Sequence, residues 1–185
     1  MSADLRALRD DPFALLLALE QRLRSVRLDA AVAGVTEVWQ GLAYRIGDRW
    51  LVSPKGDVRE VIPPPRVTRV PNARPWLSGV ANARGSLLTV VDLKQLTGGG
   101  HASSGDSRSA RVLVLNSESV PAGFVVDEVA GYRQFTVVDQ AKPSVAQDDP
   151  LEPYLLGAFA REGRSWLVLS LHRLANSESL RRAGW

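Results

Sequence analysis

An internal repeat is the feature that most constrains how this chain of 185 residues folds. Residues 75–96, PWLSGVANARGSLLTVVDLKQL, align without a gap to residues 153–174, PYLLGAFAREGRSWLVLSLHRL, and share 7 of 22 positions. The shared positions include the leading proline, both turn glycines and four apolar residues in the same order. Two copies of one supersecondary unit predict a protein built from two similar halves. Because the seam between such halves offers a groove for a partner, we expect an interaction module rather than an enzyme.

Short strands dominate the pattern after residue 43. The expected strands are 44–52, with a hairpin turn at Gly47-Asp48, and then 57–62, 66–71, 86–91, 111–115, 123–129, 133–138, 158–159 and 166–171. Proline and glycine separate many of these segments, and two longer polar loops fall at 99–109 and 139–150. Nine or ten short strands at regular spacing predict an all-β barrel or sandwich.

The N-terminal segment has a different pattern. Asp10-Asp11-Pro12 is typical of a helix start, and an apolar stripe at spacings of three and four follows through residues 16–26. We expect a helical extension over residues 1–38, with its helix at 12–27, then a β domain over 39–175 and a C-terminal tail over 176–185. The stripe suits a helix packed on its own domain, and it equally suits a helix that docks on a partner.

The charge of the chain invites a nucleic-acid interpretation. The sequence pI is 9.7, yet the net charge is only +3, and 20 of the 23 basic residues are arginines scattered along the chain. A phosphate-binding face needs several cations on one surface. We therefore favour an ordinary mixed-charge surface, and a small nucleic-acid-binding β-barrel stays the alternative function.

The sequence offers little for catalysis or cofactor binding. Cysteine is absent, and the two histidines, His101 and His172, have no second ligand at metal-binding spacing. No phosphate-binding loop, HExxH motif or GxSxG elbow occurs. We expect no enzymatic activity, no cofactor and no metal. No apolar run is long enough to span a membrane and no secretory signal is evident, so we expect a cytoplasmic protein.

The segment from Gly79 to Gly85 precedes a strongly apolar strand and has an arginine as its penultimate residue. The two glycines permit tight backbone paths, and Arg84 stands at the entrance to the strand with a permanently charged, fork-shaped side chain. Two interpretations are open. Arg84 ties the loop to a nearby carboxylate or carbonyl, or it orders or forms a binding surface.

This segment resembles the signature of the CheW-like domain family, a GVxNxRGxxxPVxDL pattern. Further matches follow in the family's order at DVREVI (57–62), AGFVVDEV (122–129), YLLG (154–157) and the closing strand and helix at 166–174. Together they cover residues 43–175. The N-terminal extension and the wording RPWLSGVANARG resemble the family members that serve type IV pilus twitching motility.

The resemblance implies two interlaced five-stranded β-barrels without catalytic activity. It also implies a role in coupling the cytoplasmic tips of methyl-accepting chemoreceptors to a CheA-type histidine kinase. The residues expected at the receptor and kinase surface are Val58, Glu60, Gly79, Asn82, Arg84 and Gly85. Three positions depart from the family pattern: Thr89 replaces the usual proline, Ala83 replaces a leucine, and Ser170 stands where aspartate is common.

Overall fold

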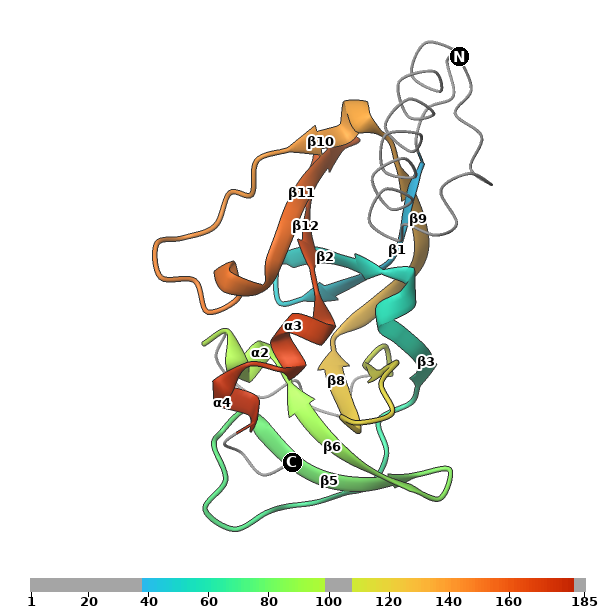
Figure 1. The fold of residues 1–185 in the computed structure, drawn as a ribbon, viewed down its shortest axis with the longest axis vertical. Coiled ribbons are helices and arrows are strands. Elements are labelled where there is room, and N and C mark those ends of the chain that lie inside the picture. Colours follow the sequence, from blue (N-terminus) through green and yellow to red (C-terminus); the bar gives the residue numbers. More distant parts are fainter. Residues whose placement is uncertain (1–37, 99–107, 182–185) are drawn as a thin grey trace, which may run out of the picture. The chain divides into compact units, whose positions relative to one another are not determined.

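The computed structural model describes residues 38–98 and 108–181, and the predicted N-terminal helix lies outside these ranges. The described chain forms two six-stranded sheets, with short helical turns where strands end (Figure 1). The prediction of an all-β protein is confirmed. No described helix is both long and apolar enough to cross a bilayer.

The first sheet combines strands from both ends of the described chain, in the order β10-β11-β12-β2-β1-β9. Its strands are β1 (Trp39–Ile46), β2 (Arg49–Pro54), β9 (Glu128–Phe135), β10 (Gln140–Ala141), β11 (Leu155–Arg161) and β12 (Arg164–Leu169). All neighbours are antiparallel except β12 and β2, which are parallel.

The second sheet contains the six consecutive strands from β3 to β8, in the order β3-β7-β8-β6-β5-β4. Its strands are β3 (Val58–Ile62), β4 (Val67–Thr68), β5 (Leu77–Ala83), β6 (Ser86–Asp92), β7 (Arg111–Leu115) and β8 (Ala122–Val126). Here β6 and β8 are the parallel pair. Read from β4 to β3, this sheet has the same pattern of directions as the first sheet read from β10 to β9, so the two halves share one topology.

The sequence repeat occupies equivalent places in the two halves. Residues 75–96 form β5, β6 and the helical turn α2 (Leu93–Leu96), and residues 153–174 include β11, β12 and most of α3 (Leu171–Ala175). In each copy the N–H at the end of the second strand donates to a carbonyl at the start of the repeat. These bonds join Asp92 to Trp76 at 2.8 Å and Ser170 to Tyr154 at 3.0 Å. Asp92 and Ser170 also cap the helical turn that follows each of them. The two similar halves predicted from the repeat are therefore present.

The edge strands β3 and β9 also share a register shift against their neighbours. The register of β3 against β7 shifts between Val58 and Glu60, and the register of β9 against β1 shifts between Val129 and Gly131. Because β7 and β1 hold the same place in their sheets, Gly131 stands in the first half where Glu60 stands in the second.

The expectation of closed five-stranded barrels is wrong. Each sheet has six strands, and in the described ranges no ladder joins β10 to β9 or β4 to β3. The added outer strands, β4 and β10, contain two residues each. Each of them pairs with one neighbour, β4 with β5 and β10 with β11.

Two strand boundaries differ from the prediction for identifiable reasons. The expected strand 123–129 breaks at Asp127, whose carboxylate accepts the N–H of Gly47 at 2.6 Å while the chain passes from the second sheet to the first. The expected strand 133–138 stops at Phe135, because a capping box between Thr136 and Asp139 begins a 3₁₀ turn.

Three apolar clusters stabilise this arrangement. One lies within each half, and the third packs both sheets against α3. The third cluster includes Tyr44 from the first sheet, Phe124 from the second and Leu171 from α3. Leu180, in the predicted C-terminal tail, is also buried there, on the helical turn α4 (Glu178–Arg181).

Buried hydrogen bonds tie the two halves together. Asp57, in the 3₁₀ turn η1 (Lys55–Asp57) between β2 and β3, accepts the N–H groups of Leu171 at 2.8 Å and His172 at 3.4 Å. The carboxylate therefore holds the start of α3 against the crossover between the sheets. Within the first sheet, the hydroxyl of Tyr44 bonds Ser53, and burial raises the pKa of this phenol far above its usual value.

Candidate protein-interaction site

The predicted site residues lie on two elements of the second half. Arg84 and Gly85 form the turn between β5 and β6, Asn82 lies near the end of β5, and Glu60 lies on β3. Nη2 of Arg84 is 3.2 Å from Oε2 of Glu60. Since β3 is one edge of the sheet and β5 lies near the other, this ion pair bridges the side of the half that backbone pairing leaves open. The interpretation that Arg84 ties its loop to a nearby carboxylate is therefore correct.

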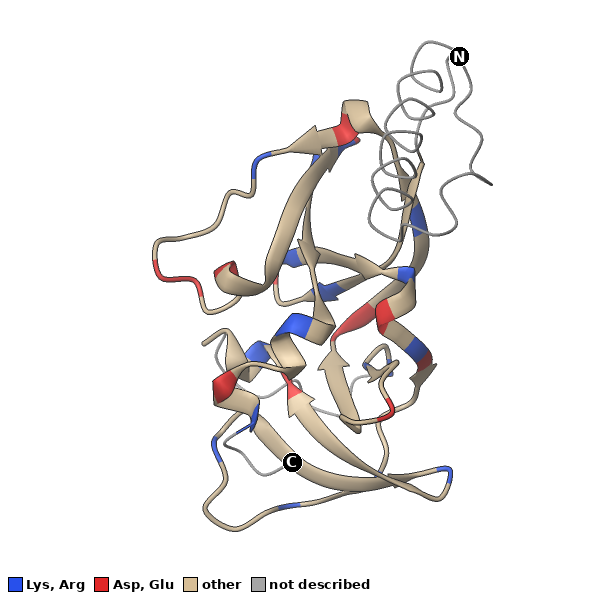
Figure 2. Ribbon diagram, in the orientation of Figure 1, with Lys and Arg blue, Asp and Glu red and all other residues tan. Residues whose placement is uncertain are grey.

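Arg84 is nevertheless largely free to contact a partner. Its side chain is 80% exposed, whereas that of Glu60 is 23% exposed. A guanidinium has five N–H donors in a fixed plane, and one ion pair leaves most of them open to solvent. Figure 2 shows this cationic tip of the β5–β6 hairpin. Anchoring and partner binding are thus compatible in one side chain.

The backbone of the hairpin turn explains the glycine and the asparagine. Arg84 has a φ of 51° and Gly85 a φ of 85°. Two consecutive positive φ values are what a type I′ hairpin turn requires, and glycine adopts them without steric cost. The Asn82 side chain accepts the N–H of Gly85 at 2.9 Å and so fixes the turn. Asn82 and Gly85 set the position of Arg84.

Val58 and Gly79 are buried, so they support the site from within. Val58 belongs to the apolar cluster shared by the two halves. Gly79 has a φ of 137°, and a Cβ atom there would come within 2.1 Å of the carbonyl oxygen of Thr68 on β4. Glycine at position 79 therefore permits β4 to pair closely with β5. The structure brings Glu60 and the hairpin turn together at the surface, while Val58 and Gly79 shape the scaffold beneath.

Two exposed apolar residues that are close to this pair in the sequence were not singled out there. Leu87, on β6 beyond the turn, is 65% exposed, and Val61, beside Glu60 on β3, is 38% exposed. Adjacent leucines in a strand point to opposite faces, so the pair Leu87-Leu88 could have signalled an outward leucine. Exposed apolar side chains of this kind can add contact area to a protein-binding surface.

A groove with a volume of about 630 Å³ borders the same half. Its walls come from the proline-rich segment after β3, from β4 and β5, and from the loop between them, and include Pro64, Pro65 and Val67. Apolar side chains of the sheet, among them Leu77 and Val90, also line it. The lining therefore combines apolar side chains with the charged side chains of Arg69 and Arg74. Such a surface suits the binding of a protein segment.

The described residues contain no cluster of three potential metal ligands. His172 is half-buried on α3, and His101 lies outside the described ranges. The chemistry that the described site offers is therefore hydrogen bonding, ion pairing and apolar contact.

Comparison with known proteins identifies the family. The model of the CheW-like domain matches residues 40–179. Protein PilI of Pseudomonas aeruginosa is 39% identical over 170 residues, which cover 90% of this chain and 93% of that protein. Protein FrzA of Myxococcus xanthus is 33% identical over 120 residues, covering 65% of this chain and 73% of FrzA.

A solved structure shares the fold. The crystal structure of the scaffolding protein TtCheW from Thermoanaerobacter tengcongensis superposes with a TM-score of 0.65 at 20% sequence identity, covering 76% of this chain and 94% of TtCheW. With the family model spanning both sheets, and with the PilI match running through nearly the whole sequence, this chain belongs to the CheW-like domain family.

Proposed function

We propose that this protein is a non-catalytic coupling adaptor that links chemoreceptors to a CheA-type histidine kinase in a pathway controlling type IV pilus twitching motility. The observation that carries the proposal is the likeness to PilI over 90% of the chain, including part of the segment that precedes the β domain. The likeness to FrzA and to several chemotaxis CheW proteins supports the broader chemosensory role.

The duplicated architecture suits a protein that holds two partners at once. Each half has its own apolar cluster, and the third cluster joins the halves into one body. Such a body can keep a receptor and a kinase in a fixed relative geometry. A small change in the receptor then shifts the population of active kinase, because the adaptor transmits a difference in binding free energy without chemistry of its own.

The surface around Arg84 and Glu60 is our candidate for receptor or kinase binding. It offers an exposed guanidinium on a turn that Asn82 fixes, and β3 and β6 also expose the apolar side chains of Val61 and Leu87. Charged groups at the rim favour correct encounter, and the apolar groups supply contact area.

A genetic test separates this function from others. Deletion of the gene in the source bacterium should abolish twitching while pili are still assembled, and wild-type protein supplied in trans should restore movement. Unchanged twitching after deletion would contradict the pathway assignment. In vitro, purified receptor fragment and kinase should each bind the protein at micromolar concentration or tighter.

A further inference from the structure

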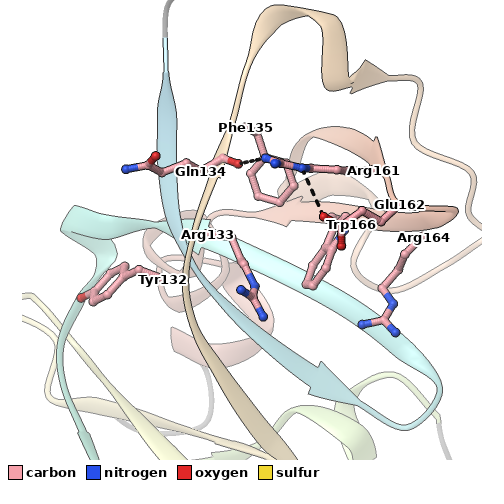
Figure 3. A pocket seen from close by; sticks show the side chains of 8 residues that line it. All are labelled: Tyr132, Arg133, Gln134, Phe135, Arg161, Glu162, Arg164 and Trp166. Carbon is pink, nitrogen blue, oxygen red and sulfur yellow. Dashed lines mark hydrogen bonds and ion pairs between the residues drawn. The ribbon is translucent and has the colours of Figure 1, made fainter.

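The first half has its own groove at the place equivalent to the site just described. The groove has a volume of about 370 Å³ and lies between β9 and the β11–β12 hairpin (Figure 3). β9 corresponds to β3, and the β11–β12 hairpin corresponds to the β5–β6 hairpin. The side chains that form the surface ion pair have no equivalents here, because Gly131 replaces Glu60 and Glu162 replaces Arg84. The two equivalent surfaces therefore differ in chemistry.

An arginine still bridges the open side of this half, but it uses a backbone acceptor. Nη1 of Arg161 donates to the carbonyl oxygen of Gln134 on the edge strand β9 at 2.7 Å, and Nε lies 3.7 Å from Glu162. Arg161 is thus already engaged with its own half. Its position sets the width of the groove and does not offer a free cation.

Two further arginines, Arg133 and Arg164, line this groove without an ion-pair partner among the described residues. The guanidinium carbon of Arg164 lies 4.6 Å from the ring centre of Trp50 and 5.6 Å from that of Trp166, so stacking holds it in place. Arg133 stands exposed on β9, and in the view of Figure 3 Trp166 lies between Arg133 and Arg164. Among the described residues, neither arginine forms an ion pair. Phe135 belongs to the aromatic cluster beneath, with its ring edge-on to that of Trp166 at 5.8 Å.

We propose that this groove is a second docking site and that it takes an acidic segment of a protein partner. Two guanidiniums that no carboxylate of the described ranges pairs with, one of them fixed by stacking, match the carboxylates of aspartate or glutamate side chains, which they can bind through two parallel hydrogen bonds. The inference rests on the proposed function only in taking the occupant to be a protein.

The same features argue against a nucleic acid as the occupant. Single-stranded nucleic acids bind by stacking bases on open aromatic faces along a positively charged track. Here Trp166 is buried, with 7% of its surface exposed, and Arg164 covers Trp50. Within the part of the chain that the structure describes, the groove thus offers two arginines without ion pairs and few open ring faces.

The full-length protein labelled with ¹⁵N provides the test. The probe is a capped seven-residue peptide of alternating glutamate and valine, and the controls are the same peptide with glutamine for glutamate and a 20-nucleotide single-stranded DNA. Binding should shift the indole N–H signals of Trp50 and Trp166 and leave that of Trp76, in the other half, unchanged. The glutamine peptide and the DNA should bind at least tenfold more weakly.

Variants make the test specific. Arg133→Glu with Arg164→Glu should weaken peptide binding more than tenfold. Arg66→Glu with Lys142→Glu changes the net charge equally at exposed positions away from the groove, and should alter affinity less than twofold. If the first double variant melts early, Arg133→Gln alone, on the exposed strand, should still weaken binding severalfold.

The proposal is overturned if both double variants lose peptide affinity equally or if the DNA binds more tightly than the peptide. It is also overturned if the indole signal of Trp76 shifts in place of those of Trp50 and Trp166. These outcomes leave the adaptor function untouched, because receptor and kinase binding are measured separately.

Discussion

Replacement of Arg84 by alanine should reduce partner binding far more than folding stability. The ion pair with Glu60 spans 3.2 Å, but the Arg84 side chain is 80% exposed. Exposed pairs contribute only about 0–1 kcal/mol to stability, because water and salt screen them. For a domain of this size we expect the melting temperature to fall by no more than about 4 °C.

The expected effect on affinity is larger. A hydrogen bond to a charged group at an interface is worth about 1.5–3 kcal/mol. If Arg84 gives one such bond to a receptor or kinase carboxylate, its loss should raise Kd by about 10- to 150-fold. Isothermal titration with the purified receptor fragment and with the kinase, alongside thermal melting of the same samples, measures both quantities.

The second copy of the hairpin supplies a matched control. Glu162 occupies the same turn position, with a φ of 54° against 51° for Arg84, and glycine follows in both copies. The variant Glu162→Ala therefore carries the same backbone penalty for alanine at positive φ but leaves the Arg84–Glu60 pair intact. Its affinity should not fall below that of the wild type, because the carboxylate that is removed lines the first-half groove, where it would oppose an acidic partner. The reasoning fails if Arg84→Ala melts many degrees lower with unchanged Kd, or if Glu162→Ala loses affinity equally.

Three further variants test the scaffold beneath the site. Asp57→Ala removes the acceptor of two backbone N–H groups at the start of α3. The free energy of unfolding, measured in urea, should fall by about 2–4 kcal/mol. A fall below about 1 kcal/mol would mean that water replaces the carboxylate. Gly79→Ala forces a Cβ atom to within 2.1 Å of the Thr68 carbonyl oxygen. It should lower the free energy of unfolding by at least about 1–3 kcal/mol and speed amide exchange in β4. Unchanged exchange would contradict the close approach. Deletion of residues 1–30 should leave a β-rich protein with a cooperative melt, because the two sheets have their own apolar clusters; a non-cooperative melt would assign the segment to the core.

Most of the architecture that could be predicted followed from the internal repeat. Its glycines and apolar positions mark a hairpin and the helical turn that follows, and these local features recur in both halves with the same turn geometry. The count of strands per sheet was not predictable in this way. β4 and β10 have two residues each, too few for any periodicity, and they exist because a neighbouring strand supplies hydrogen-bond partners.

Contacts between distant residues explain the remaining differences. The break at Asp127 depends on the N–H of Gly47, 80 residues earlier in the chain. The pair of Glu60 with Arg84 arises because β3 and the β5–β6 hairpin meet across the open side of one half, which no local pattern encodes. The groove of the first half likewise depends on tertiary stacking of Arg164 over Trp50.

The central claim is that one copy of this protein holds a chemoreceptor and a histidine kinase together. Sedimentation velocity of the full-length protein with the kinase and with a receptor cytoplasmic fragment from the same bacterium tests it directly. We expect a three-component species that is absent when the adaptor is omitted and that Arg84→Ala depletes more than Glu162→Ala does. If receptor and kinase displace each other from the adaptor, or if neither binds, the protein does not couple them.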